Sequence, residues 1–514
     1  MSSVVRSWRT AFLTLRDEIL ASPPRATVLH LLNQLILSQS DSLIAATPDL
    51  PPHEVTSDLM LLLELARNIS HAEEMEDVTQ SFTKISQLIH GITHGSSLEM
   101  NSTSWVLMLD FFERIVQFFL RKAKTESVLI GTVSEIKATK QCLESLKYLF
   151  GLYQASASLS ENEQLLQFVL QVVGYFQRES IYSSYSSDSH TACRDVCEIL
   201  TLVFAMIGEV YSRVHSSLPV EIWLSTIEVL RKVMDILASR SLLLEDNIIA
   251  MFYIELLQCL HLVLSEPRGY LADHVAGFVA ALRIFFRYGL LDKSLVMNQA
   301  TNDKKEVGPT NKNAQCEVSN RSRTGPYRPP HLRKKIVGNQ QCKDSECLVS
   351  SKHEIISSDS DCSDSDGTMT DSCGIHFAKA RLAAILCIQD LCRADPKLFM
   401  AQWTMLLPSN DVLQHRKYET TLMSCLLFDP CLKVRIAAGS TITAMLDGPA
   451  SVSLQVAEFR GHSKCGSFTA LSSSLGHILM QLHSGTLFLI KHETNSRLLA
   501  LSFKILMLLL SSTP

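Results

Sequence analysis

The chain has 514 residues, of which 46% are apolar and 19% are charged. This balance provides enough apolar surface for a large buried core and enough length for two or more domains. Lysine and arginine together number 47, against 52 aspartate and glutamate residues, so the net charge of -5 gives no overall bias toward nucleic acid or a membrane surface.

The start of the chain and its cysteines predict an intracellular protein. The first twenty residues contain Arg6, Arg9, Arg16, Asp17 and Glu18, and no apolar stretch of the signal-peptide type follows the basic residues. The fourteen cysteines show no paired framework spacing, which favours reduced thiols. We therefore expect the protein in the cytoplasm, the nucleus or both.

Residues 1–290 repeat one pattern, in which helical runs of about twenty residues alternate with short polar breaks. In the stretch SENEQLLQFVLQVVGYFQRES, Ser160 and Glu163 have the spacing of a capping box, and a broad apolar stripe follows them. Alternation of period two is almost absent, so strands are not expected. The pattern predicts an N-terminal helical-repeat block over residues 1–290.

The width of these apolar stripes predicts how the helices pack. A broad stripe cannot be covered by one neighbour, and stacking antiparallel helix pairs in a row covers it from both sides. A closed globular bundle is the competing arrangement, but about eleven helices are many for one bundle core. The sequence therefore favours an α-solenoid.

The most apolar run is NIIAMFYIELLQCLHLVLSEP, residues 247–267. Glu255, Gln258 and His261 interrupt it, whereas a membrane span needs about 18 or more uninterrupted apolar residues. We interpret this run as a buried helix and expect no membrane among the partners.

Residues 291–374 contain few apolar residues and predict a disordered linker, because such a segment cannot offset the entropy cost of ordering. Its charges are segregated. Nine basic and two acidic residues lie between Lys304 and Lys335, whereas eight acidic residues and one basic residue lie between Asp344 and Asp371. The linker is therefore bipolar, basic first and acidic second.

The basic half contains GPYRPPHLRKK, in which proline favours extended backbone, the aromatic rings can stack and the cations can bind phosphate. The candidate binding residues are Tyr327, Arg328, Pro329, Pro330, His331, Arg333, Lys334 and Lys335. The string YRPPHLR is similar to a short element in the tails of some DEAD-box RNA helicases. A solvated basic run, a protein-binding motif and an RNA contact all fit the sequence.

The acidic half contains SSDSDCSDSD, in which Ser358 and Ser363 are each followed three residues later by an aspartate. This is the pattern favoured by acidophilic kinases, and each phosphate adds about -1.5 to -2 charges. We hypothesise that phosphorylation of these serines controls whether the basic arm engages a partner.

Helical periodicity returns over residues 375–514. Asp429-Pro430 marks a turn, and Arg435 with Ala438 and Ile442 continues at helical spacing. This string resembles the second helix of a HEAT repeat, and the resemblance implies that Asp429 and Arg435 belong to a polar ladder between repeats. Arg381 and Arg497 begin similar but less complete strings.

A wider resemblance covers both the linker and this block. GPYRPPHLRKK, SDSDCSDSDG, KARLAAILCIQDL, FDPCLKVRIAA, KCGSF and SLGHILMQLHSGTLFLI, in this order, are similar to the HEAT repeat-containing protein 6 family, most strongly over residues 375–514, which resemble its domain of unknown function. The resemblance implies an armadillo-type helical fold and no known catalytic activity. We expect an all-α solenoid of the armadillo/HEAT type, in two helical blocks that the linker separates. The last helix is strongly apolar, so we also expect the second block to be truncated at its C-terminal end.

The sequence carries no motif of a catalytic, nucleotide or cofactor site. Cys193 and Cys197 could supply two metal ligands, but no second pair is present, so buried thiols and no metal are expected. Glu64, Glu198 and Glu255 lie within apolar helices, yet spacing identifies no basic partner for any of them. We therefore expect no catalytic residue, cofactor or small-molecule substrate.

The sequence therefore predicts a non-enzymatic scaffold or adaptor that binds other proteins. The alternative is an adaptor associated with RNA or ribonucleoprotein that uses the basic arm at residues 321–335.

Overall fold

The computed structural model describes residues 3–20, 24–69, 76–95, 98–125, 132–178, 190–239, 243, 245–290, 372–413, 420–448, 454–455, 457 and 470–512. All regular secondary structure in these ranges is helical, which confirms the predicted all-α fold. The chain forms two compact units. Unit 1 comprises residues 1–285 and 383–402, and unit 2 comprises residues 286–382 and 403–514.

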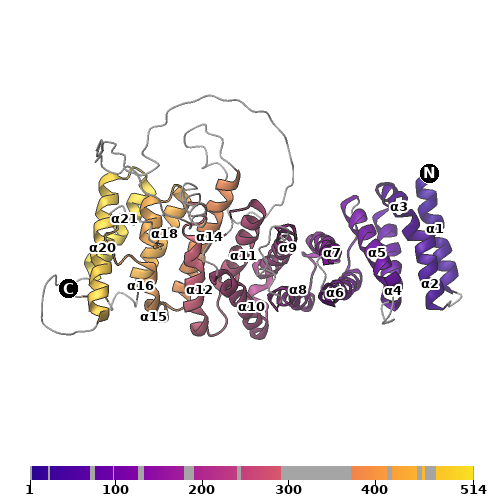
Figure 1. Ribbon diagram of the computed structural model, residues 1–514, viewed down its shortest axis with the longest axis horizontal. Coiled ribbons are helices and arrows are strands. Elements are labelled where there is room, and N and C mark those ends of the chain that lie inside the picture. Colours follow the sequence, from indigo (N-terminus) through magenta and orange to yellow (C-terminus); the bar gives the residue numbers. More distant parts are fainter. Residues whose placement is uncertain are drawn as a thin grey trace, which may run out of the picture. The chain divides into compact units, whose positions relative to one another are not determined.

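Unit 1 is built from α-helices, most of them long (Figure 1). They are α1 (Ser3–Leu20), α2 (Arg25–Leu31), α3 (Ser40–Ala46), α4 (Pro52–Ile69), α5 (Glu76–Gly95), α6 (Ser102–Thr125), α7 (Thr132–Tyr153), α8 (Leu159–Arg178), α9 (His190–Val214), α10 (Val220–Ala238), α11 (Asn247–Ser265), α12 (Ala272–Phe285) and α15 (Pro396–Phe399). The second half of α14 (Ser372–Ala394) also belongs to this unit.

The helices of unit 1 form two layers. The even-numbered helices α2 to α12 contact one another in succession, and so do the odd-numbered helices α1 to α11. Helices that follow each other in the chain join the layers, as α6 with α7 and α8 with α9. Each helix therefore has neighbours on two or more sides, which is the α-solenoid arrangement expected from the broad apolar stripes.

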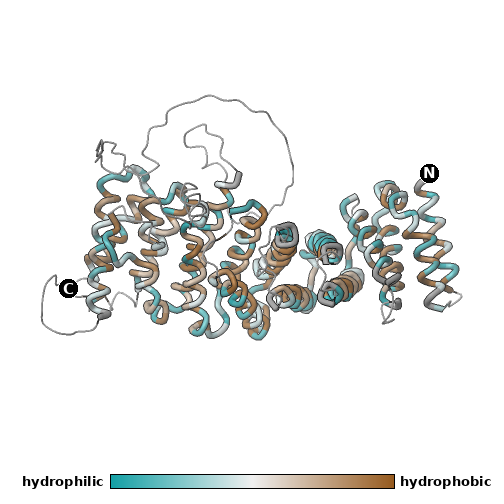
Figure 2. Tube along the Cα trace, viewed as in Figure 1, coloured by the Kyte–Doolittle hydropathy of each residue, from teal (hydrophilic) through white to brown (hydrophobic). Residues whose placement is uncertain are grey.

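Burial follows this arrangement. Figure 2 shows hydrophobic residues along the helix sides that face other helices in unit 1. Trp8, Trp105 and Trp223 are fully buried. The indole Nε1 of Trp223 donates to the carbonyl oxygen of Val263 at 3.0 Å, which ties α10 to α11 through a group that needs a partner once it is buried.

Helix α11 is, among the described residues, the one helix long and apolar enough to cross a membrane by length and composition. Within the structure, 61% of its most apolar window is buried. The interrupting residues Glu255 and His261 are half-buried, and Gln258 is exposed. The helix therefore packs as a core element of unit 1, as the sequence predicts.

Two local predictions differ from the structure. The capping box of α8 is formed by Ser158 and Glu161, not by Ser160 and Glu163. The Ser158 hydroxyl accepts from the Glu161 N–H at 3.3 Å, and the Glu161 carboxylate accepts from the Ser158 N–H at 2.7 Å. The helix begins two residues earlier because Glu161 also accepts hydrogen bonds from the hydroxyls of Ser102 and Tyr153.

The second difference concerns the end of the predicted linker. Residues 372–374 already belong to α14, while residues 291–371 lie outside the described residues. The predicted disorder and charge pattern of the linker therefore remain predictions. The predicted domain boundaries at 290 and 375 likewise remain predictions.

Unit 2 contains the first half of α14 and the helices α16 (Trp403–Leu406), α17 (Leu422–Phe428), α18 (Leu432–Leu446), α20 (Ala470–His492) and α21 (Ser496–Ser512). Residues 286–290 pack against α14, where the rings of Tyr288 and Phe377 lie 4.8 Å apart. Gly289 has φ 72°, and a Cβ atom there would lie 2.6 Å from the Cβ of Phe377. This turn therefore requires glycine.

Two buried ion pairs connect the helices of unit 2. Arg381 on α14 donates to both carboxylate oxygens of Asp429, at 2.8 and 3.1 Å, and to the carbonyl oxygen of Tyr288 at 2.7 Å. Arg435 on α18 pairs with Glu493, which precedes α21. Each of these two arginines thus pairs with an acidic residue in the turn before a later helix, whereas Arg497, which begins the third string, is exposed.

We predict that Arg381→Met destabilises unit 2 by about 3–5 kcal/mol, because it leaves the buried Asp429 carboxylate without its counter-ion. The Arg381 and Asp429 side chains are only 3% and 1% exposed, so water cannot replace the lost partner. Urea unfolding of the full chain measures the effect, and Arg393→Met, an exposed position on the same helix, is the control. Equal unfolding midpoints for the two variants would contradict the prediction.

We also predict that residues 1–290 and 372–514, expressed as separate chains, co-purify. Helix α14 completes unit 1 through the pair of His261 with Asp390 and through the thiol of Cys387, which donates to the carbonyl oxygen of Leu257 at 3.2 Å. Leu257→Asp places a charge at a fully buried position and should abolish co-purification, whereas Leu398→Asp, at an exposed position, should not. Affinity capture through a tag on the second fragment checks both expectations.

Candidate functional site

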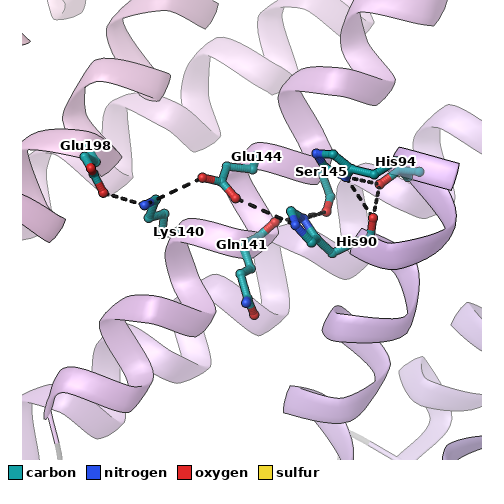
Figure 3. Close-up of polar contacts among 8 residues, drawn as sticks. His90, His94, Lys140, Gln141, Glu144, Ser145 and Glu198 are labelled. Carbon is teal, nitrogen blue, oxygen red and sulfur yellow. Dashed lines mark hydrogen bonds and ion pairs between the residues drawn. The ribbon is translucent and has the colours of Figure 1, made fainter. Parts of the chain in front are cut away.

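A group of interacting polar residues, most of them partly exposed, lies across α5, α7 and α9 (Figure 3). We call it the polar cluster, and it consists of His90, His94, Lys140, Gln141, Glu144, Ser145 and Glu198. Three successive helices of the odd-numbered layer contribute to it. The cluster therefore lies along the direction in which the helices stack.

Helical spacing explains why these residues share a surface. Lys140, Glu144 and Tyr148 follow one another at intervals of four on α7, and His90 and His94 do so on α5. The residues between them, such as Leu143 and Leu146, are fully buried. The apolar side of each helix is thus buried against neighbouring helices, and the polar side lies at the surface.

Lys140 is placed between two carboxylates, as Figure 3 shows. Its Nζ bonds to Glu198 on α9 and lies 3.8 Å from an oxygen of Glu144. Burial lowers the pKa of Lys140, but the bond to Glu198 and the charges of Glu198, Glu144 and Asp195 outweigh it, so this pKa lies above its usual value. Lys140 therefore stays charged and links α7 to α9.

Glu144 is held more loosely than Glu198. Its carboxylate lies 3.8 Å from Lys140 Nζ and 4.0 Å from Nε2 of His90, both beyond hydrogen-bond distance. Its side chain is 31% exposed. Glu144 therefore keeps acceptor capacity at the surface.

The hydrogen bonds assign the tautomers of the two imidazoles. The Ser145 hydroxyl donates to the carbonyl oxygen of Gln141 at 3.0 Å, so its oxygen accepts from Nδ1 of His90 at 3.2 Å. Nδ1 of His94 donates to the carbonyl oxygen of His90 at 2.8 Å. In the neutral form, both rings therefore carry their free lone pair on Nε2.

Burial lowers the pKa of His90, and the neighbouring His94 lowers it further. Glu144 acts in the opposite direction but does not compensate. His90 is therefore neutral at physiological pH, which preserves the acceptor on Nε2.

An aromatic edge continues the polar cluster. The rings of His90 and His94 lie 4.1 Å apart, and the rings of His94 and Tyr148 stack at 6.0 Å with 22° between their planes. Tyr148 is 39% exposed and Leu152, one turn further along α7, is 44% exposed. The surface thus combines acceptors with exposed aromatic and aliphatic groups.

The structure shows only part of what the sequence singled out. The candidate motif residues Tyr327, Arg328, Pro329, Pro330, His331, Arg333, Lys334 and Lys335 and the candidate phosphorylation sites Ser358 and Ser363 lie outside the described residues. Asp429 and Arg435 are described, and each forms a buried ion pair with a residue from another part of unit 2.

Glu198, for which spacing identified no basic partner, pairs with Lys140, which lies 58 residues earlier in the chain. No local pattern in the sequence indicates this pair, and none indicates Glu493 as the partner of Arg435. Such pairs become visible only when the stacking of the helices is known.

The described residues contain no group of three or more histidine, cysteine, aspartate or glutamate side chains arranged to hold a metal ion. Burial raises the pKa of the Cys142 and Cys392 thiols to about 12, so both remain protonated. Cys197 is also buried, as expected. These thiols are packing residues.

Residues 379–514 match a family model described as a domain of unknown function (DUF4042). The match covers about a quarter of the chain. It begins within α14 and includes α15 to α21. The matched range lies inside residues 375–514, which are predicted to form a domain of unknown function, and the matched description gives no activity.

We predict that His90→Gln reduces the pH dependence of stability below pH 6.5. A histidine with a lowered folded-state pKa contributes stability above its unfolded pKa, near 6.5, and loses it as the pH falls toward the folded value. The wild-type Tm should therefore fall between pH 7.5 and 5.5, and the fall should be smaller in His90→Gln. The exposed His30→Gln is the control, and a fall identical to wild type in His90→Gln contradicts the prediction.

Proposed function

We propose that the protein is a non-enzymatic scaffold that binds segments of other proteins along the odd-numbered helix layer of unit 1. The observation that carries this proposal is the row of half-exposed acceptor and aromatic side chains across α5, α7 and α9. Helices stacked in a row present equivalent positions at regular steps, so an extended chain can contact several helices at once.

The sequence resemblance of residues 375–514 to the HEAT repeat-containing protein 6 family, which implies an armadillo-type fold, supports this role. Other proteins are the proposed partners, with no membrane and no small-molecule substrate. The linker adds a proposed control point, at which phosphorylation of Ser358 and Ser363 changes how freely the basic arm at residues 321–335 meets a partner. These parts of the proposal rest on sequence.

We predict that Tyr148→Glu with Leu152→Glu removes partners from the protein without unfolding it. Both side chains are exposed, so the substitutions place charge on the surface and not in the core. Proximity labelling in cells compares the proteins marked by wild type and by this variant. We expect at least a fivefold loss of labelling for the direct partners, since hot-spot residues typically contribute 1 kcal/mol or more.

The matched control is Val106→Glu with Leu159→Glu, which changes two exposed apolar residues on the even-numbered helices α6 and α8. Circular dichroism confirms equal helix content in all three proteins. Loss of the same partners from the control variant, or their retention by the Tyr148 and Leu152 variant, would overturn the proposed binding surface.

A further inference from the structure

Three groups of the polar cluster at or beside His90 can accept hydrogen bonds from a ligand. Nε2 of His90 and Nε2 of His94 carry free lone pairs, because their Nδ1 atoms already donate to Ser145 and to the carbonyl oxygen of His90 (Figure 3). Glu144 adds two carboxylate oxygens. A ligand for this surface must therefore supply several donors.

The charges around Lys140 leave one carboxylate available to a cation. Three carboxylates, those of Glu144, Asp195 and Glu198, act on the single ammonium group of Lys140. Lys140 satisfies Glu198 first, because its Nζ is bonded to Glu198 and lies 3.8 Å from Glu144. Glu144 is thus the carboxylate that remains for a ligand.

A metal ion does not meet these requirements, because no three of the described histidine, cysteine, aspartate and glutamate side chains are arranged to hold one. The acceptors are spread over two helices, and the stacked rings of His94 and Tyr148 lie beside them. A planar organic cation with several N–H groups fits such a spread of acceptors and can stack on the exposed Tyr148 ring.

We infer that the surface formed by His90, His94, Glu144 and Tyr148 binds an arginine side chain of a partner segment. The guanidinium group carries five donors and no acceptor, so it can donate to Glu144 and Nε2 of His90 while its plane packs on Tyr148. A lysine has a compact, strongly hydrated charge and stacks less well. This inference rests on the proposed scaffold function and names the chemistry that its α5–α7 surface recognises.

Protonation of the imidazoles opposes binding. A proton on Nε2 converts an acceptor into a donor and adds positive charge beside the guanidinium group. The charged side chains on these helices include Lys84 on α5, Lys140, Glu144 and Lys147 on α7, and Asp195 and Glu198 on α9. Histidine is the side chain whose unperturbed pKa lies in the range from pH 5 to 8, so a change of affinity between pH 7.5 and 5.5 tests the proposed role of the imidazoles.

The test uses the full chain and a fluorescein-labelled peptide, Gly-Arg-Pro-Gly-Arg-Pro, with two analogues in which lysine or the neutral citrulline replaces arginine. Fluorescence anisotropy at fixed salt measures the three affinities. We expect the arginine peptide to bind about fivefold to tenfold more tightly than the lysine peptide. The citrulline peptide should bind most weakly, and lowering the pH from 7.5 to 5.5 should weaken the arginine peptide several-fold.

Two variants locate the site. Glu144→Gln and Tyr148→Ala should each weaken the arginine peptide about tenfold, because one removes the charged acceptor and the other the stacking surface. Glu163→Gln, which neutralises a half-exposed carboxylate on α8, should leave the affinity unchanged.

Equal affinities of the arginine and lysine peptides for the wild-type chain would overturn the inference, whether or not the variants fold. So would an unchanged affinity in a Glu144→Gln protein of normal helix content. If the arginine and lysine peptides bind equally while cellular partners are still lost from the Tyr148 and Leu152 variant, the scaffold function stands and the inferred recognition of arginine is wrong. If those partners are retained as well, both proposals fail.

Discussion

The constraint on which the structure depends is the width of the apolar stripe on each helix. Helix α8 illustrates it, since Leu165, Leu166, Val169 and Val172 are all buried although they point to different sides of the helix. One neighbour cannot cover all of them, and α8 contacts α6, α9 and α10. Two layers of parallel helices satisfy this requirement at every step, so the hydrophobic effect alone selects stacking. The two-layer packing leaves only a narrow strip of each helix exposed, and any binding function must use these strips.

Charged pairs between helices give the stack its register. In unit 1, Arg67 pairs with Asp110 and Lys140 with Glu198, each pair joining neighbouring helices of one layer, and His261 on α11 pairs with Asp390 on α14. Most of these side chains are a quarter to a half exposed, so their net contribution to stability is small. The pairs of unit 2 are different because Arg381, Asp429 and Arg435 are nearly excluded from water. A buried charge without a partner costs several kcal/mol of stability, so these helices must pack in the arrangement that gives each arginine its acidic partner.

The sequence predicted the elements far better than it predicted their pairing. Apolar periodicity located the helices because every turn of a buried helix carries apolar residues, and this pattern is visible in any short window of sequence.

The choice between two overlapping capping boxes was harder to make from the sequence. The stretch from Ser158 to Glu163 contains two overlapping S-x-x-E strings, and the tertiary bonds of Glu161 to Ser102 and Tyr153 select the first. The polar cluster could not be predicted from the sequence. His90 contacts Ser145, and Lys140 contacts Glu198, and each pair is separated by more than fifty residues in the chain. Their proximity follows from the stacking of α5, α7 and α9, which a pattern within one helix does not contain.

Two carboxylates near Lys140 differ in their hydrogen bonding, and this difference shows how a stack of helices can provide a binding site. Glu144 and Glu198 are almost equally exposed, at 31% and 29%, and both lie near Lys140. The ammonium group of Lys140 is hydrogen-bonded to Glu198 and not to Glu144, which lies 3.8 Å away. The bond to Glu198 links α7 to α9. Glu144 lies on the same helix as Lys140, so a closer bond between them would add nothing to the stacking. The register of the helices therefore uses one carboxylate and leaves the other with unsatisfied acceptors at the surface, where a donor from another molecule can replace the water that now solvates it.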